Sequence, residues 1–145
     1  MKLKSKFTQI VNIKKQNLSK IEANLAKKRS EAIIIDGFIS EATAAILAYE
    51  MPQSGSFMDV RSSLEILKTM RREKELLVER LGLVKTEILH LEHQYKNANL
   101  EFEKMKYLQT QDFKIQIQAI KRAEDAALDE FATIKFARSK VLGKF

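Results

Sequence analysis

Mostly apolar residues recur in two long stretches of this 145-residue sequence, at steps of three and four except for one seven-residue step from Val11 to Leu18, and with a lysine at one position of each stretch. The first stretch comprises Phe7, Val11, Leu18, Ile21, Leu25, Lys28, Ala32, Ile35, Ile39, Ala42, Ile46 and Tyr49. The second comprises Met70, Lys74, Leu77, Leu81, Val84, Ile88, Leu91, Tyr95, Ala98, Phe102 and Met105. A mean step of about 3.5 residues keeps one side of a helix against a partner helix over many turns, as in a coiled coil. The sequence therefore predicts two long helices that pack on each other.

A short segment, residues 51–56, separates the two stretches. It contains the only proline, Pro52, which disfavours helical conformation at Met51 before it. Ser56, followed three residues later by Asp59, resembles a capping box at the start of a new helix. We therefore expect an all-α, long antiparallel two-helix coiled-coil hairpin. It would form a single domain over residues 1–145, with helix one at about 4–50, the turn at 51–56 and helix two at about 57–141.

The expected second helix is much longer than the first. If the helices pair outwards from the turn, helix one ends opposite about Met105, which leaves about 35 residues of helix two as an overhanging C-terminal end. The apolar stripe also shifts there, with an eight-residue step to Phe113 where seven is expected. It continues as Ile117, Ile120, Glu124, Ala127, Phe131, Ile134, Arg138 and Val141. We expect this segment to bind a partner outside the chain.

A second irregularity follows the turn, where Val60, Leu64 and Leu67 begin a stripe. Apolar character then moves to Met70, which leaves Ile66 beside the seam. Three apolar residues of helix one also lie outside its stripe: Ile34, Phe38 and Ala45. Such residues either contact a partner or widen the core, and the pattern leaves both possibilities open.

Composition argues against an enzyme. Four glycines, one proline and 31% charged residues are typical of long helices, and a two-helix seam encloses no interior for a substrate. His90 and His93 lie three residues apart near Glu87 and Glu92, but zinc sites need three or four converging ligands. No glycine-rich nucleotide loop is present. We expect no catalytic residue, metal, cofactor or small-molecule substrate.

Charge and hydropathy bear on the compartment and the partners. The longest apolar run, residues 32–49, is interrupted by Asp36 and Glu41, so we expect no integral membrane segment and a cytoplasmic protein. The net charge of +7 is concentrated in residues 1–30, which sum to +8, whereas residues 31–60 sum to −5. This basic end is most simply a solvated surface or a contact for an acidic protein. Nucleic acid is not expected, because no base-reading or aromatic-stacking motif accompanies it.

The sequence of residues 128–132, Leu-Asp-Glu-Phe-Ala, followed by Lys135, Arg138 and Lys140, resembles the carboxy-terminal motif of the FliJ family of flagellar type III export proteins. Chain length, high charge, lack of cysteine and the expected hairpin are similar to that family too. The resemblance implies a non-enzymatic component that couples the export ATPase hexamer to the export gate protein FlhA and associates with export chaperones. It would lie in the cytoplasm, peripheral to the membrane-embedded export apparatus.

The same resemblance implies two contact surfaces. The ATPase ring would contact Leu128, Asp129, Glu130, Phe131, Lys135 and Arg138. The gate would contact Ile35, Phe38, Ile66, Met70, Glu73 and Leu77, with Glu73 in place of the family's small apolar residue. The off-stripe positions of Phe38 and Ile66 support the second surface independently.

Two alternatives come from other classes of protein. A central-stalk subunit of a rotary ATPase shares the hairpin, but such proteins are longer and usually have a second, globular portion. A basic coiled-coil nucleic-acid-binding protein is the other alternative, and its binding would fall steeply with salt.

Overall fold

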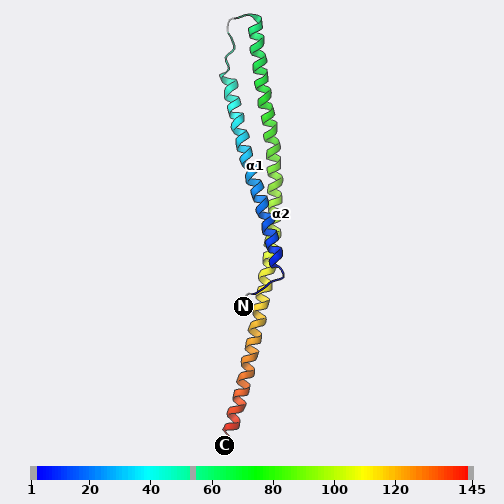
Figure 1. Cartoon of the computed structure of the whole chain (residues 1–145), viewed down its shortest axis with the longest axis vertical. Helices are drawn as coiled ribbons and strands as arrows, with labels where there is room; N and C mark the ends of the chain where they lie inside the picture. The colour runs from blue at the N-terminus through cyan, green and yellow to red at the C-terminus, as the bar shows by residue number, and fades with distance from the viewer. Residues whose placement is uncertain (1–2, 53–54, 144–145) are drawn as a thin grey trace. The chain divides into compact units, whose positions relative to one another are not determined.

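The computed structural model describes residues 3–52 and 55–143, and within them it contains two α-helices and no strand. Helix α1 spans Thr8–Ala48 and helix α2 spans Phe57–Leu142. The helices run antiparallel and pack against each other as a helical hairpin, and α2 extends beyond the amino-terminal end of α1 (Figure 1). The predicted all-α, two-helix coiled-coil hairpin with an overhanging C-terminal end is confirmed.

Local hydrogen bonds explain where the helices begin. The Ser5 hydroxyl accepts a hydrogen bond from the Phe7 amide at 3.1 Å just before α1, which starts four residues later than the expected position 4. At the start of α2, the Asp59 amide donates to the Ser56 hydroxyl, and the Ser56 amide donates to the Asp59 carboxylate, both at 3.3 Å. This is the reciprocal capping box that the sequence suggested. Residues 53 and 54 of the expected turn lie outside the described residues.

Contacts divide the chain into two units, each built from parts of both helices: residues 17–99, and residues 1–16 together with 100–145. Within both units, every described residue of the two predicted stripes is buried or half-buried. The most deeply buried are Ile35 and Val84, each 3% exposed, in the 17–99 unit. The hydrophobic core of each unit is therefore the seam between its two helix segments.

The sequence suggested a break in the seam after the turn, and this prediction is wrong. Ser63 is half-buried, whereas Leu64 is 53% exposed. The seam thus runs through Val60, Ser63, Leu67 and Met70 without a break in the alternating three- and four-residue steps. A helix cannot rotate one turn independently of the next, so the long apolar seam that follows places polar Ser63 inside and Leu64 outside.

The expected end of pairing opposite Met105 is also wrong. In the unit that contains both ends of the chain, the Gln109 side-chain amide donates to the Thr8 hydroxyl at 3.0 Å. Further along, the Gln116 amide donates to the Lys4 carbonyl at 2.7 Å. Half-buried residues continue in phase through Gln109, Asp112 and Gln116, and Phe113 of the shifted stripe is half-buried as well. Polar side chains thus prolong the pairing across the segment where the apolar stripe shifts.

Beyond this point the exposure of α2 changes abruptly. Every residue from Ile117 to Gly143 is exposed. We call residues 117–143 the overhang. It is shorter than expected because polar side chains prolong the pairing past the last strongly apolar seam residue.

Candidate partner-binding surfaces

Ion pairs mark the two edges of the hairpin in the 17–99 unit. On one edge, the Lys28 ammonium lies 2.6 Å from the Glu87 carboxylate and 3.3 Å from that of Glu31, and Arg80 lies 3.6 Å from Glu31. We call this the Lys28 edge. On the opposite edge, Arg29 lies 3.2 Å from Glu92 and the Tyr95 hydroxyl donates to Glu22. Because these pairs join α1 to α2, they fix which residues share an edge.

Lys28 occupies a seam position but reaches out to this edge. Hydrogen bonds to the carboxylates of Glu87 and, second, Glu31 raise the pKa of Lys28 above its ordinary value of 10.5. A lysine held charged by two carboxylates is a poor nucleophile or base, since its lone pair is occupied by the proton. The arrangement links α1 to α2 at this edge.

Residues one heptad apart lie on the same side of a coiled-coil helix. This spacing shows on which edge of the hairpin three of the expected gate-contact residues lie. One heptad after Glu31 on α1 is Phe38, and one and two heptads before Arg80 on α2 are Glu73 and Ile66. Phe38 and Ile66 are each 50% exposed, and Glu73 is exposed. The structure therefore brings Phe38, Ile66 and Glu73 to the Lys28 edge.

The other three expected gate-contact residues lie in the seam. Ile35 is 3% exposed, and Met70 and Leu77 are half-buried. Their side chains hold α1 against α2, so they are not part of an exposed face while the hairpin is closed. The exposed surface is smaller than the family resemblance implied.

Two further residues on this edge were recognised in the sequence only as apolar residues outside the stripe, and no partner was assigned to them. Ile34 is 56% exposed and lies one turn before Phe38. Ala45 follows Phe38 by one heptad and is exposed. We call Ile34, Phe38, Ala45, Ile66 and Glu73 the edge patch. Only the cross-helix ion pairs show that these α1 and α2 residues share one side.

All six expected ring-contact residues are exposed and lie in the overhang. Leu128 and Phe131 are each 65% exposed. Steps of three and four residues put Leu128, Phe131, Lys135 and Arg138 on one face of α2, whereas Asp129 and Glu130 point to other sides. The overhang therefore offers a partner an apolar face with basic residues at its far end.

The sequence model of the family described as "Flagellar FliJ protein" matches residues 3–141, nearly the whole chain. The chain belongs to the FliJ family. The predicted resemblance is thus confirmed, and it gives the chain a general role in flagellar protein export by a type III secretion system. No curated protein and no solved structure matches the chain.

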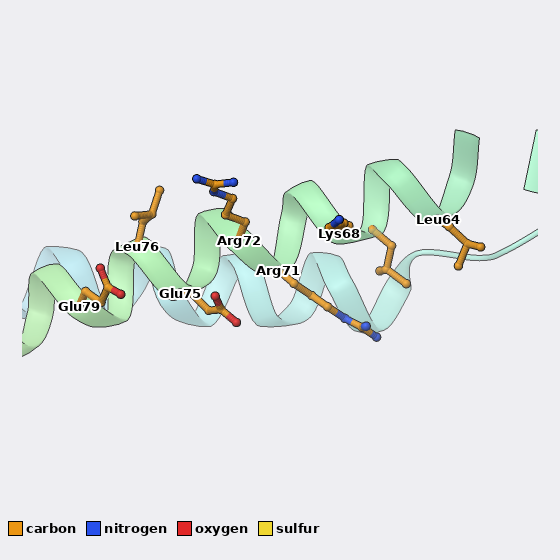
Figure 2. Close-up of a pocket in the computed structure, with 8 residues that line it drawn as sticks. Leu64, Lys68, Arg71, Arg72, Glu75, Leu76 and Glu79 are labelled. Carbon is orange, nitrogen blue, oxygen red and sulfur yellow. The ribbon is translucent and has the colours of Figure 1, made fainter. Parts of the chain in front are cut away.

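FliJ-family proteins are non-enzymatic export components. A shallow hollow is lined by Leu64, Leu67, Lys68, Arg71, Arg72, Glu75, Leu76 and Glu79, all from α2 (Figure 2). The side chains of Arg71 and Arg72 diverge in this view. Catalysis needs groups that converge on one reacting atom, and a hollow with a single helix as its wall does not provide them.

The two histidines of this FliJ-family chain are each engaged along α2. His90 hydrogen-bonds with Gln94 at 3.1 Å, and His93 with Asn97 at 3.3 Å. Among the described residues, no three His, Cys, Asp or Glu side chains come together as a metal site would require. In the same part of the chain, neither helix has a stretch long and apolar enough to cross a membrane.

Proposed function

We propose that this chain links the hexameric export ATPase to the export gate protein FlhA and associates with export chaperones, without enzymatic activity of its own. It would act in the cytoplasm, peripheral to the membrane-embedded export apparatus. The observation that carries the proposal is the FliJ family match, because residues 3–141 include both exposed surfaces described above. One partner would bind the overhang and the other the edge patch.

The overhang is the proposed contact with the ATPase ring. It has no covering helix among the described residues, and its exposed Phe131 offers the kind of aromatic anchor that dominates protein interfaces. Binding there would bias assembly of the hexamer and its rate of ATP turnover. The effect would be mechanical or allosteric.

The edge patch is the proposed contact with FlhA. Phe38 and Ile66 are half-exposed apolar side chains on the same edge as the exposed Glu73. A gate surface with an apolar groove and a nearby basic residue would complement this arrangement. Binding of the patch would shift the gate towards an energised state.

The ring contact is tested by mixing the chain with the cognate export ATPase and measuring hexamer formation and ATP hydrolysis. We expect the wild-type chain to promote both, and Phe131→Ala to weaken binding by about fivefold to thirtyfold, as for a buried aromatic anchor. Phe136→Ala is the matched control, since Phe136 is 70% exposed and lies on another face of the same helix segment. Helical content should stay nearly unchanged in both variants, and a large loss for Phe131→Ala would instead indicate a structural residue.

The gate contact is tested by titration with the purified cytoplasmic part of FlhA. The double variant Phe38→Ala and Ile66→Ala should bind at least about tenfold more weakly than wild type. Ile33→Ala combined with Leu89→Ala is the control, because these residues are 73% and 67% exposed and lie off the Lys28 edge. No effect of the wild-type chain on the ATPase, together with no binding to FlhA, would refute the proposed function.

A further inference from the structure

The overhang displays a coiled-coil stripe against which no other helix packs in residues 3–52 and 55–143. Its stripe keeps alternating three- and four-residue steps and comprises Ile117, Ile120, Glu124, Ala127, Phe131, Ile134, Arg138 and Val141, all exposed. Phe131 is 65% exposed and Ile134 is 57% exposed. An isolated helix of this length is only marginally stable in water and gains most of its stability from packing its apolar face. The stripe therefore fits another helix with the same repeat.

Two charged residues interrupt this stripe, and their placement is symmetric. Glu124 lies seven residues before Phe131, and Arg138 lies seven residues after it. We propose that the overhang pairs antiparallel with the overhang of a second copy of this chain. In the register derived below, each Glu124 faces Ile134 of the second copy and lies one helical turn from Arg138 of that copy, twice per dimer, so that the two long side chains can reach each other as partners of opposite charge. A parallel pair would place Glu124 against Glu124 and Arg138 against Arg138, which repel.

Side-chain sizes and flanking charges select one antiparallel register. With Ala127 opposite Phe131 of the second copy, a small residue meets a large one, and Ile117 meets Val141. The hairpin is itself an antiparallel pair of helices, and its edge pairs Arg29–Glu92 and Glu31–Arg80 show the offset between residues that face each other beside the seam. We apply the same offset to the dimer. The flanking pairs that result are Leu128 with Lys135 and Ala123 with Glu130, and neither of them opposes like charges.

The next register, one heptad away, is disfavoured by charge. It would place Phe131 opposite Ile134 of the second copy and would bring Glu130 against Glu130 and Lys135 against Lys135 at the flanks. Like charges directly opposite each other destabilise a pair of helices. The sequence thus specifies both the direction and the register of the dimer.

Self-pairing covers Phe131, so a partner that binds this face competes with the second copy. The dimer is a property of the chain alone and does not depend on the proposed role in export. If the ATPase does not bind, we still expect the dimer to form. The failure of one proposal therefore does not imply the failure of the other.

The first test is sedimentation of the full-length chain from low micromolar to several hundred micromolar concentration. We expect a monomer–dimer equilibrium in which Glu124→Arg and Arg138→Glu each raise the dissociation constant about tenfold, because each replaces two attractive contacts by repulsive ones. The double charge swap should restore it to within about threefold of wild type. Asp129→Arg, on another face of the same helix, is the control and should have little effect. A chain that stays monomeric throughout, or a dimer unaffected by the single swaps, would overturn the proposal.

The second test measures direction and uses the absence of cysteine from the chain. Ile117→Cys and Val141→Cys proteins are prepared separately and then oxidised alone and as a mixture. Antiparallel pairing predicts a rapid disulfide only in the mixture, because residues 117 and 141 of different copies lie opposite each other, whereas identical residues lie about 36 Å apart along the axis. Rapid disulfide formation by either variant alone would show a parallel dimer and would refute the proposed arrangement.

Discussion

Helix α2 has the same apolar periodicity in two regions, with opposite outcomes. In the 17–99 unit its stripe packs against α1, and Val84 is only 3% exposed. In the overhang the stripe is uncovered, and Phe131 is 65% exposed. The pattern determines which side of a helix is apolar, but the length of the other helix decides whether that side finds a partner within the chain. The covered stripe stabilises the hairpin, and the uncovered one is available for binding.

The largest expected difference between these regions is in amide hydrogen exchange. At low micromolar concentration, amides of residues 117–143 should exchange about a hundredfold or more faster than amides around Val84. The overhang can open locally at little cost, whereas the hairpin opens only by separating its seam. Mass spectrometry of peptic fragments measures this directly. Equal protection in both regions would show that the overhang is stabilised without a partner.

Removal of a seam side chain should have the next largest effect. Ile35→Ala is expected to lower the free energy of unfolding by about 2–4 kcal/mol, because truncation of an isoleucine that is only 3% exposed leaves a cavity. Ile33→Ala, two residues earlier and 73% exposed, should change it by less than about 0.5 kcal/mol. Urea denaturation followed by circular dichroism compares the two. A small effect of Ile35→Ala would argue that Ile35 acts in binding instead of packing.

Much of the fold could be predicted because periodicity is a local property of the sequence. Every described residue of the two long stripes, from Phe7 to Tyr49 and from Met70 to Met105, is buried or half-buried in the structure. The failures occur where a polar residue occupies a seam position, as Ser63 and Gln116 do. Hydropathy cannot identify such positions, since they are imposed by the neighbouring turns of the same helix.

The candidate surfaces could be predicted only in part, for a different reason. Which residues of α1 and α2 share an edge depends on the offset between the helices, and this offset is a tertiary property. The ion pairs of Lys28 with Glu87 and of Arg80 with Glu31 establish it, and only then do Phe38 and Ile66 fall on one side. A pattern within one helix contains no such information.

A smaller effect is expected from a glycine within the paired region. Gly82 lies inside α2, is exposed, and a Cβ added there would meet nothing within 4 Å. Gly82→Ala should therefore stabilise the hairpin by about 0.5–1 kcal/mol through helix propensity alone. The reverse change in the overhang, Ala126→Gly, should reduce helical content but leave the main unfolding transition in place. A shift of that transition by Ala126→Gly would mean that the two regions unfold together.

The smallest expected effect concerns the pH dependence of the Lys28 edge. The folded-state pKa of Lys28 is raised above 10.5, so its ion pairs contribute stability that is complete below the unfolded-state pKa and is lost as pH rises through the folded-state pKa. Stability should thus fall more steeply above about pH 10.5 in wild type than in Lys28→Met, as measured by the urea midpoint at a series of alkaline pH values.

Lys27→Met is the control for this comparison, since it removes a neighbouring exposed lysine while it keeps the Lys28 pairs and the tyrosines that titrate in the same range. The slope of stability against pH is the informative quantity, because methionine at a seam position also adds apolar packing. If Lys28→Met and wild type lose stability in parallel, the Lys28 pairs do not contribute to hairpin stability. The seam alone would then hold the two helices in register.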